Sequence, residues 1–263
     1  MPRLAANLNM TTSLAGRTAL VTGAGRGIGR AVAMGLAGYG VTVALVARSG
    51  DELAESAAQV QQLGGRALTV RADLGDPDQV ASVVERTASE LGPVGILVNN
   101  AAVVAPLGPS LHVDPADWAA ALQVNVVAPA TLSFALLPAM IEARWGRIVN
   151  VSSGIAAHPG AMVGMNAYAA SKAALEAHSL NLAAELSGTG VTVNVFRPGS
   201  VDTAMQGWIR AQDPGKIGAR LHEFFEKSYA AGTLMTPESS ARSLLDRLSG
   251  DATGAIWEAS PPG

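Results

Sequence analysis

Residues 17–29 read RTALVTGAGRGIG, an apolar strand pattern that runs directly into a glycine-rich loop and then into a helical pattern. In such a loop Gly23 permits a tight turn, Gly27 lets main chain approach a pyrophosphate, and Gly29 lets helix and strand pack closely. Unpaired N–H groups at the positive end of the helix, where Ile28 lies, then favour an anion. The stretch predicts a dinucleotide-binding strand–loop–helix unit.

On the carboxyl side of this unit, short apolar runs alternate with segments of helical periodicity. The alternation predicts βαβ units, and therefore an α/β fold with a Rossmann-type, doubly wound parallel sheet that carries helices on both faces. Ligands of such sheets bind at the carboxyl ends of the strands. The predicted strands are 18–22, 41–47, 67–71, 96–99, 147–151 and 191–196, and the predicted helices are 27–37, 52–63, 78–91, 116–143 and 168–186.

The pattern changes after Pro198. Residues 202–233 mix polar residues with several aromatics, and they are equally compatible with a helical pair packed on the core and with a lid over an apolar pocket. Helical periodicity resumes at 237–248, and 255–257 is expected to be a last edge strand.

Length and composition favour one large soluble domain of 14–263, preceded by a flexible leader of 1–13. The net charge of −3 does not fit a nucleic-acid-binding protein or a polycationic membrane-surface protein. Without cysteine the chain forms no disulfide and no thiolate site. No secretory signal is visible, so we expect a cytoplasmic protein. The uncharged stretch 118–141 is interpreted as a buried or interfacial helix rather than a membrane span, because polar residues and prolines interrupt it.

The end of the second predicted strand bears on the choice of dinucleotide. An NAD enzyme places a carboxylate there to bind the ribose hydroxyls, whereas this strand ends at Arg48. Arg48 and Arg26 of the glycine-rich loop can pair with a 2′-phosphate. NADP(H) is therefore favoured, although NAD(H) remains possible because Arg48 could simply be solvated.

Two neighbouring patterns supply groups for acid–base chemistry. Tyr168 and Lys172 are four residues apart and share one face of a predicted helix. A nearby ammonium, aided by a cationic nicotinamide, is expected to lower the phenol pKa, so that Tyr168 exchanges a proton with substrate while hydride moves. Ser152 and Ser153 end a predicted strand, where one hydroxyl can stabilise charge on a carbonyl oxygen or merely bond the loop.

These motifs stand in the order seen in short-chain dehydrogenases/reductases, which the chain resembles over about residues 14–258. The resemblance implies a one-domain Rossmann-type fold with seven parallel strands, usually assembled as a homotetramer or dimer on the helices around Asn125 and Tyr168. The matching elements are Thr22-Gly-x3-Gly-x-Gly29, Asp73, Asn99-Asn100-Ala101, Asn125, Ser153, Tyr168-x3-Lys172 and Pro198-Gly199-x-Val201-x-Thr203.

The resemblance also implies a role for each matching residue. Tyr168 would be the acid/base, Lys172 would lower its pKa and hold the nicotinamide ribose, and Ser153 would orient the carbonyl. Asn125 would position a water that links Lys172 to solvent. The remaining matches would contact the cofactor: Asp73 and Leu74 at the adenine, Asn99 and Ala101 at the ribose, and Pro198, Gly199, Val201 and Thr203 at the carboxamide.

Three departures from the family pattern matter. Ala102 replaces a usual glycine, which slightly crowds the cofactor. Ser153 lies fifteen residues before Tyr168, about two more than is common, so Ser152 is the alternative catalytic serine. Ala184 precedes Glu185 where reductases that act on carrier-bound acyl groups commonly have a basic residue, which argues against such a substrate.

The sequence thus predicts an NADP(H)-dependent oxidoreductase that interconverts a ketone or aldehyde and an alcohol, most simply a carbonyl reductase for a moderately apolar small molecule. The alternatives are an NAD(H)-dependent alcohol dehydrogenase, a non-catalytic dinucleotide-binding regulator, and an epimerase or dehydratase that uses the same Tyr–Lys pair. The histidines have no metal-site spacing, so no metal is expected.

Overall fold

Seven parallel strands form a single sheet in the order β3-β2-β1-β4-β5-β6-β7. The structure, a computed structural model, describes residues 14–259, so the predicted leader 1–13 lies outside the described residues. The predicted α/β doubly wound Rossmann-type sheet is confirmed, and the predicted strands match within one or two residues. The strands are β1 (Thr18–Thr22), β2 (Thr42–Ala47), β3 (Ala67–Arg71), β4 (Ile96–Asn99), β5 (Gly146–Val151), β6 (Val191–Arg197) and β7 (Ile256–Glu258).

The direction of winding reverses beside β1. The chain moves outward from β1 through β2 to β3, then returns to pair β4 with the other edge of β1. In open α/β sheets this switch point leaves a crevice at the carboxyl ends of the two central strands. The glycine-rich loop after β1 lies at that crevice.

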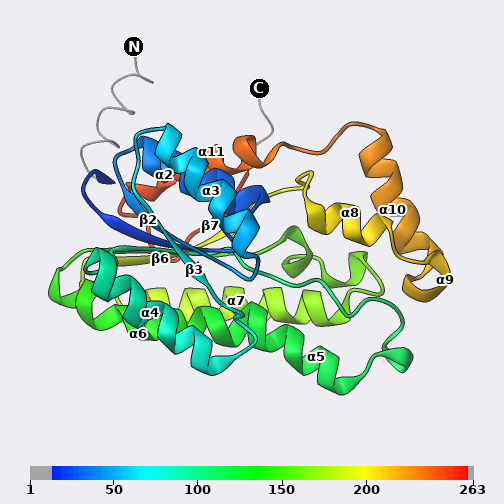
Figure 1. Ribbon diagram of the computed structural model, residues 1–263. Helices are drawn as coiled ribbons and strands as arrows, with labels where there is room; N and C mark the ends of the chain where they lie inside the picture. Colours follow the sequence, from blue (N-terminus) through cyan, green and yellow to red (C-terminus); the bar gives the residue numbers. More distant parts are fainter. Residues whose placement is uncertain (1–13, 260–263) are drawn as a thin grey trace, which may run out of the picture.

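Helices cover both faces of the sheet, with α2, α3 and α11 on one and α4, α6 and α7 on the other (Figure 1). Because helices cover both faces, β1 and β4 are buried at every position. Such strands therefore carry apolar side chains on both faces. The helices are α2 (Gly27–Gly38), α3 (Gly50–Gln62), α4 (Pro77–Leu91), α6 (Ala128–Glu142), α7 (Asn166–Glu185) and α11 (Pro237–Leu248).

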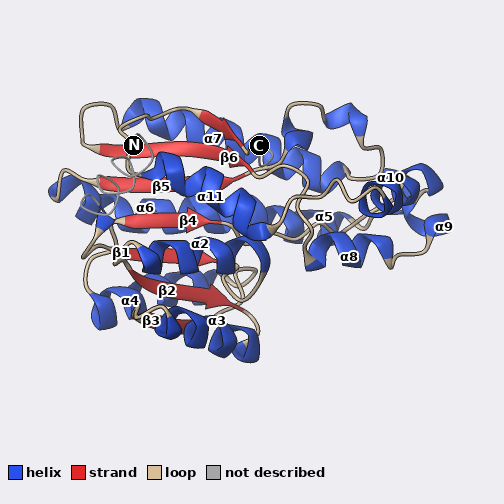
Figure 2. Cartoon of the chain, turned by 90° about the horizontal axis from the view of Figure 1, so that it is seen from above, coloured by secondary structure: helices blue, strands red, loops and turns tan. Residues whose placement is uncertain are grey.

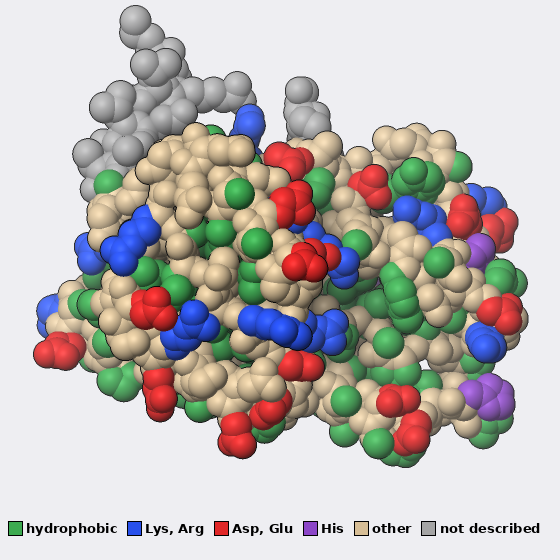
Figure 3. All heavy atoms as spheres, in the orientation of Figure 1, with side chains coloured by type: hydrophobic (Ala, Val, Ile, Leu, Met, Phe, Trp, Pro, Cys, Tyr) green, Lys and Arg blue, Asp and Glu red, His purple; other side chains and the backbone are tan. Residues whose placement is uncertain are grey.

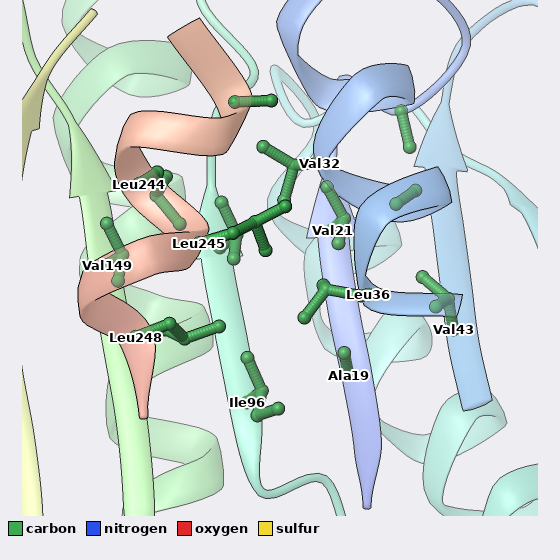
Figure 4. Packing of buried hydrophobic residues seen from close by; sticks show 14 of the residues in the cluster. Ala19, Val21, Val32, Leu36, Val43, Ile96, Val149, Leu244, Leu245 and Leu248 are labelled. Atoms are coloured by element: carbon green, nitrogen blue, oxygen red, sulfur yellow. The ribbon is translucent and has the colours of Figure 1, made fainter. Parts of the chain in front are cut away.

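The core on the first face joins the beginning of the chain to its end. Val32 and Leu36 of α2 pack beside Leu244 and Leu248 of α11, over strand residues that include Ile96 (Figure 4). A second apolar cluster fills the space between the sheet and α4, α6 and α7. The first cluster fixes α2, and with it the glycine-rich loop, on the sheet.

The predicted helix 116–143 consists of three consecutive helical elements, α5 (Pro115–Leu122), the π-helical segment η2 (Gln123–Val127) and α6. The run Pro115–Glu142 is long and apolar enough to cross a membrane by length and composition, but that test is also passed by core helices of soluble proteins. Its α6 part packs against α4 and the sheet. We therefore interpret it as a core and surface helix of the fold.

Beyond the carboxyl ends of the strands, the predicted lid 202–233 folds into α8 (Ala204–Arg210), α9 (Pro214–Ile217) and α10 (Ala219–Ala230). These helices extend away from the sheet, at the right in Figure 2. Apolar side chains show on this part of the surface in Figure 3. Trp208 of α8 and Phe224 of α10 are each 44% exposed. The expected edge strand at 255–257 is β7, shifted by one residue.

Candidate active site

A cavity of about 390 Å³ opens at the switch point. It runs from the glycine-rich loop, past the end of β2, to Tyr168 and Lys172 on α7. Most of the predicted cofactor residues line it: Gly23, Arg26, Gly27, Ile28, Arg48, Asp73, Leu74, Ala101, Tyr168, Lys172, Pro198 and Thr203. Gly29, Asn99, Gly199 and Val201 do not line it, and Ala102 does without closing it.

The glycine-rich loop has the geometry of an anion cradle. Gly23 and Gly27 adopt positive φ values of 65° and 56°, a conformation that side chains disfavour. A Cβ on Gly29 would lie 2.3 Å from the Gly23 carbonyl oxygen, so this position accepts only glycine. The first turn of α2 holds no acidic residue, and the side chain of Arg26 does not cap it. Its free N–H groups therefore suit the pyrophosphate of a dinucleotide.

The end of β4 is tied to this loop through Thr22. The Thr22 hydroxyl oxygen accepts from the N–H groups of Asn100 and Ala101, both at 3.0 Å. Asn100 Nδ2 donates to the carbonyl oxygens of Thr22 at 3.0 Å and Gly23 at 3.3 Å. Asn100, which the sequence analysis gave no role, thus lines the cavity and shapes the cradle.

The side chain of Asn99 takes a different place from the one expected of a ribose contact. It is buried between β4 and β5, and its Nδ2 donates to Asn150 Oδ1 at 2.8 Å. Successive side chains of a strand point to opposite sides, so Asn99 enters the core while Asn100 faces the cavity. Any cofactor contact by Asn99 is left to its main chain.

Charged groups meet at the far end of the cavity, after β2. Arg26 and Arg48 both line it, as predicted, and so does Glu52 in the first turn of α3. Arg26 Nη1 lies 3.0 Å from Glu52 Oε1. Asp73 accepts from the Gly75 N–H at 2.9 Å, which orders the turn after β3. No sequence pattern predicts Glu52 as a residue of the cavity, because its approach to Arg26 depends on how α2 and α3 pack.

The segment after β6 is held by Met235 across a parallel bridge to Val201. Met235 donates its N–H to the Ser200 carbonyl at 2.8 Å and accepts from the Asp202 N–H at 2.9 Å. Val201 is buried, and Gly199 has a φ of 76° that turns the chain. Pro198 and Thr203 line the cavity, whereas Gly199 and Val201 lie in the same segment without lining it.

Tyr168 and Lys172 lie one turn apart on α7, at the inner end of the cavity. Lys172 is 2% exposed, and its Nζ donates to the Val151 carbonyl at 2.7 Å and lies 5.6 Å from the centre of the Tyr168 ring. Ser153 is the serine beside the Tyr168 phenol. Ser152 instead donates to the buried carboxylate of Glu176 at 2.7 Å. Of the two serines, Ser153 is therefore the one placed beside the phenol.

Burial dominates the titration of both groups. It raises the pKa of Tyr168 to about 12, with hydrogen bonding to Ser153 acting in the opposite direction. It lowers the pKa of Lys172 to about 8, with the negative charge of Glu176 opposing that shift. For the protein by itself, desolvation of the phenolate is the largest effect on the phenol pKa, and the lowering expected from Lys172 together with a cationic nicotinamide stays a prediction. At neutral pH Tyr168 carries its proton.

Asn125 is buried in the π-helical segment η2, with its side chain fully engaged by the protein. Its Oδ1 accepts from the Val103 N–H, and its Nδ2 donates to the Val103 carbonyl, both at 2.8 Å. Nδ2 also lies 3.0 Å from Ser171 Oγ. The side chain thus ties the loop after β4 to α7. A water-positioning role would fall to its main chain.

An apolar cluster lies next to Tyr168, between the lid and the loops after β4 and β5. It contains Ile209, Leu221 and Phe225 of the lid together with Ile155 and Met165, and Met162, Met205 and Tyr168 pack against it. Among the aromatics of 202–233, Phe225 thus belongs to this cluster, whereas the partly exposed Trp208 and Phe224 do not. Within residues 14–259, no three His, Asp or Glu side chains are placed to hold a metal ion.

Comparison with known proteins agrees with this geometry. Residues 17–214 match the family model described as short chain dehydrogenase. A short chain dehydrogenase of Pseudocercospora fijiensis is 41% identical over 217 residues, which cover 81% of this chain and 68% of that protein.

Two solved structures with a bound cofactor are similar throughout the fold. One, from Beutenbergia cavernae, is described as NAD(P)-dependent and has bound NADP; it is 36% identical, with a TM-score of 0.81 over 94% of this chain and 96% of that one. L-Sorbose reductase from Gluconobacter frateurii, complexed with NADPH and L-sorbose, is 28% identical, with a TM-score of 0.82 over 93% and 95%. These likenesses support a nicotinamide dinucleotide as the cofactor. The two solved structures compared above are NAD(P)-dependent oxidoreductases. The chain belongs to the short-chain dehydrogenase/reductase family.

Proposed function

We propose that this protein is an NADP(H)-dependent carbonyl reductase for a moderately apolar ketone or aldehyde. The observation that carries the proposal is the half-buried Tyr168, whose phenol is protonated at neutral pH and lies beside Ser153, between the cavity and the apolar cluster. A carbonyl oxygen between these two hydroxyls would accept a hydrogen bond from each. The apolar cluster would then bind the rest of the substrate by burying its carbon surface.

Each residue of the site has a step to perform. The glycine-rich loop, Arg26, Arg48, Asp73 and Lys172 would hold the dinucleotide, whose nicotinamide supplies a hydride when bound. Ser153 orients the carbonyl and stabilises negative charge that develops on its oxygen. Tyr168 gives its proton to that oxygen, and the Lys172 ammonium stabilises the phenolate that remains. Because an alkoxide is more basic than a phenolate, a phenol with a raised pKa is still an effective donor.

Steady-state oxidation of NADPH with a panel of carbonyl compounds tests this function. We expect turnover of aliphatic, aryl and cyclic ketones, and weaker turnover of sugars, since the apolar cluster cannot satisfy several hydroxyl groups. Tight NADPH binding without turnover of any carbonyl would instead favour a non-catalytic regulator. Turnover with NAD(H) alone would favour an alcohol dehydrogenase of the other cofactor class.

Glu52 is proposed to moderate the preference for NADP(H). Its carboxylate neutralises Arg26 and adds a negative charge near the expected site of the 2′-phosphate. Glu52→Gln removes that charge and frees Arg26, so the NADPH-to-NADH ratio of kcat/KM should rise about fivefold, the effect of roughly 1 kcal/mol for a partly exposed pair.

The matched control for Glu52→Gln is Asp51→Asn, which removes an equal charge from the same helical turn. Asp51 is exposed and does not line the cavity, so its replacement should leave the ratio unchanged. An unchanged ratio in Glu52→Gln would show that the 2′-phosphate does not bind beside Arg26.

We also propose that the protein is a soluble cytoplasmic homo-oligomer, a tetramer or dimer. Val127, Phe134 and Ile141 recur every seven residues, from the end of η2 along α6, and all three are exposed, Phe134 at 56%. Leu180 on the neighbouring α7 is exposed as well. An apolar stripe of this kind is typical of helices that pack against a second copy.

Phe134→Glu should therefore reduce the oligomer to a smaller species, because a carboxylate would be buried in a helix–helix contact. Sedimentation velocity measures the change. Leu63→Glu, at an equally exposed position directly after α3, should leave the assembly intact. A Phe134→Glu protein that sediments like the parent would exclude this stripe as an interface.

A further inference from the structure

We infer that Glu176 is a positioning residue of this site, which holds the end of β5 against α7 and keeps the Lys172 side chain in its ammonium form. The inference rests on the proposed function, because it matters only if Lys172 acts in proton transfer. Glu176 lies one helical turn beyond Lys172 and does not line the cavity.

The Glu176 carboxylate is 8% exposed and held on both oxygens. Oε1 accepts from Ser152 Oγ at 2.7 Å and from Arg197 Nε at 2.9 Å. Oε2 accepts from Arg197 Nη2 at 2.8 Å. A bidentate guanidinium and a short hydroxyl contact fix the position of the carboxylate.

This one carboxylate joins three segments that carry the site. Lys172 donates to the Val151 carbonyl, the next residue, Ser152, donates to Glu176, and Ser153 follows beside Tyr168. Arg197, the last residue of β6, is followed directly by Pro198 at the cavity. Lys172 thus holds Val151, the last residue of β5, and Glu176 holds Ser152, the residue after it. Together they determine the position of Ser153 relative to Tyr168.

The same arrangement decides the charge that Lys172 experiences. The charged or titratable groups around it are Tyr168 and Glu176 on α7 and, behind Glu176, Arg197 of β6, whose other partner is Glu258 of β7 at 3.0 Å. Burial disfavours the ammonium, and Glu176 opposes that effect. Without the carboxylate, the half-buried Arg197 guanidinium would keep only its exposed partner Glu258, so its positive charge near Lys172 would be less fully offset.

Glu176→Gln separates shape from charge, since glutamine keeps the size of the side chain and one acceptor oxygen. We expect the Lys172 titration midpoint to fall by about one pH unit, and the alkaline decline of kcat to move to lower pH by the same amount. On the acidic plateau kcat should recover most of its parental value. Arg197→Met removes the positive charge together with its hydrogen bonds to Glu176 and Glu258, and it should move the midpoint the opposite way.

NMR titration of the full chain with labelled lysine side chains measures the midpoint without any turnover. The lysines are Lys172, Lys216 and Lys227, and the last two are exposed, which distinguishes them from the buried one. Glu185→Gln removes the same charge from the exposed end of α7, and Glu258→Gln removes the exposed partner of Arg197. Both should leave the Lys172 midpoint in place.

An unchanged Lys172 midpoint in Glu176→Gln would overturn the inference, even if the fold were destabilised. Should that variant fail to fold, Arg197→Met decides, because an unmoved midpoint there has the same meaning. Failure of the proposed function and failure of this inference give different results. Absence of carbonyl turnover by the parent protein would refute the proposed function while leaving the titration readable, and an active parent with an unmoved midpoint would refute only the role of Glu176.

Discussion

Replacement of Tyr168 by Phe is expected to lower kcat for carbonyl reduction by about a thousandfold, the contribution of a well-placed general acid. Phenylalanine keeps the ring that packs against the apolar cluster, and it removes only the hydroxyl beside Ser153. The dinucleotide should still bind with nearly its original affinity, because the cradle at Gly23, Gly27 and Gly29 is untouched. Stopped-flow measurement of hydride transfer, with NADPH binding followed by fluorescence, separates the two quantities.

Tyr39→Phe is the matched control for this experiment. Tyr39 follows the carboxyl end of α2, at the opposite end of that helix from the cradle, so loss of its hydroxyl should leave kcat unchanged. A Tyr168→Phe enzyme with full activity would refute Tyr168 as the proton donor. Water entering the vacated position would give only a partial rate and a different pH dependence.

Gly29→Ala is expected to damage both folding stability and cofactor binding. The new Cβ would lie 2.3 Å from the Gly23 carbonyl oxygen and 2.5 Å from Asn100 Nδ2, so main chain must move. Overpacking against rigid backbone destabilises a fold by about 3 kcal/mol. If the cradle alone absorbs that distortion, affinity for NADPH should fall about 100-fold. Thermal unfolding and isothermal titration calorimetry measure the two effects.

Gly38→Ala provides the comparison on the same helix. A Cβ at Gly38 has no neighbour within 4 Å, and its φ is not positive. Alanine there should leave NADPH affinity unchanged and should stabilise the helix by as much as about 1 kcal/mol. If Gly29→Ala bound NADPH like the parent, the close approach of α2 to the glycine-rich loop would not matter for the cofactor.

Local sequence pattern was enough for the architecture and for part of the site. Strand and helix periodicity predicted the alternating elements within a few residues, because burial on both sheet faces imposes continuous apolar runs on strands and one apolar face on helices. The glycines of the loop and the Tyr168–Lys172 spacing are equally local, since each depends on contacts within a few residues. The π-helical segment at Asn125 had no such signal, because residues 116–143 show one continuous helical pattern.

What the sequence determined by itself was therefore the winding of the chain, the cradle at Gly23–Gly29 and the face shared by Tyr168 and Lys172. The tertiary structure alone decided that Ser153 stands beside the phenol while Ser152 binds Glu176, and that Asn100 replaces Asn99 at the cavity. It also determines that burial raises the pKa of Tyr168 in the protein by itself. The physical reason is common to all of these: desolvation and long-range hydrogen bonds depend on groups brought together from distant strands, and no spacing along the chain records them.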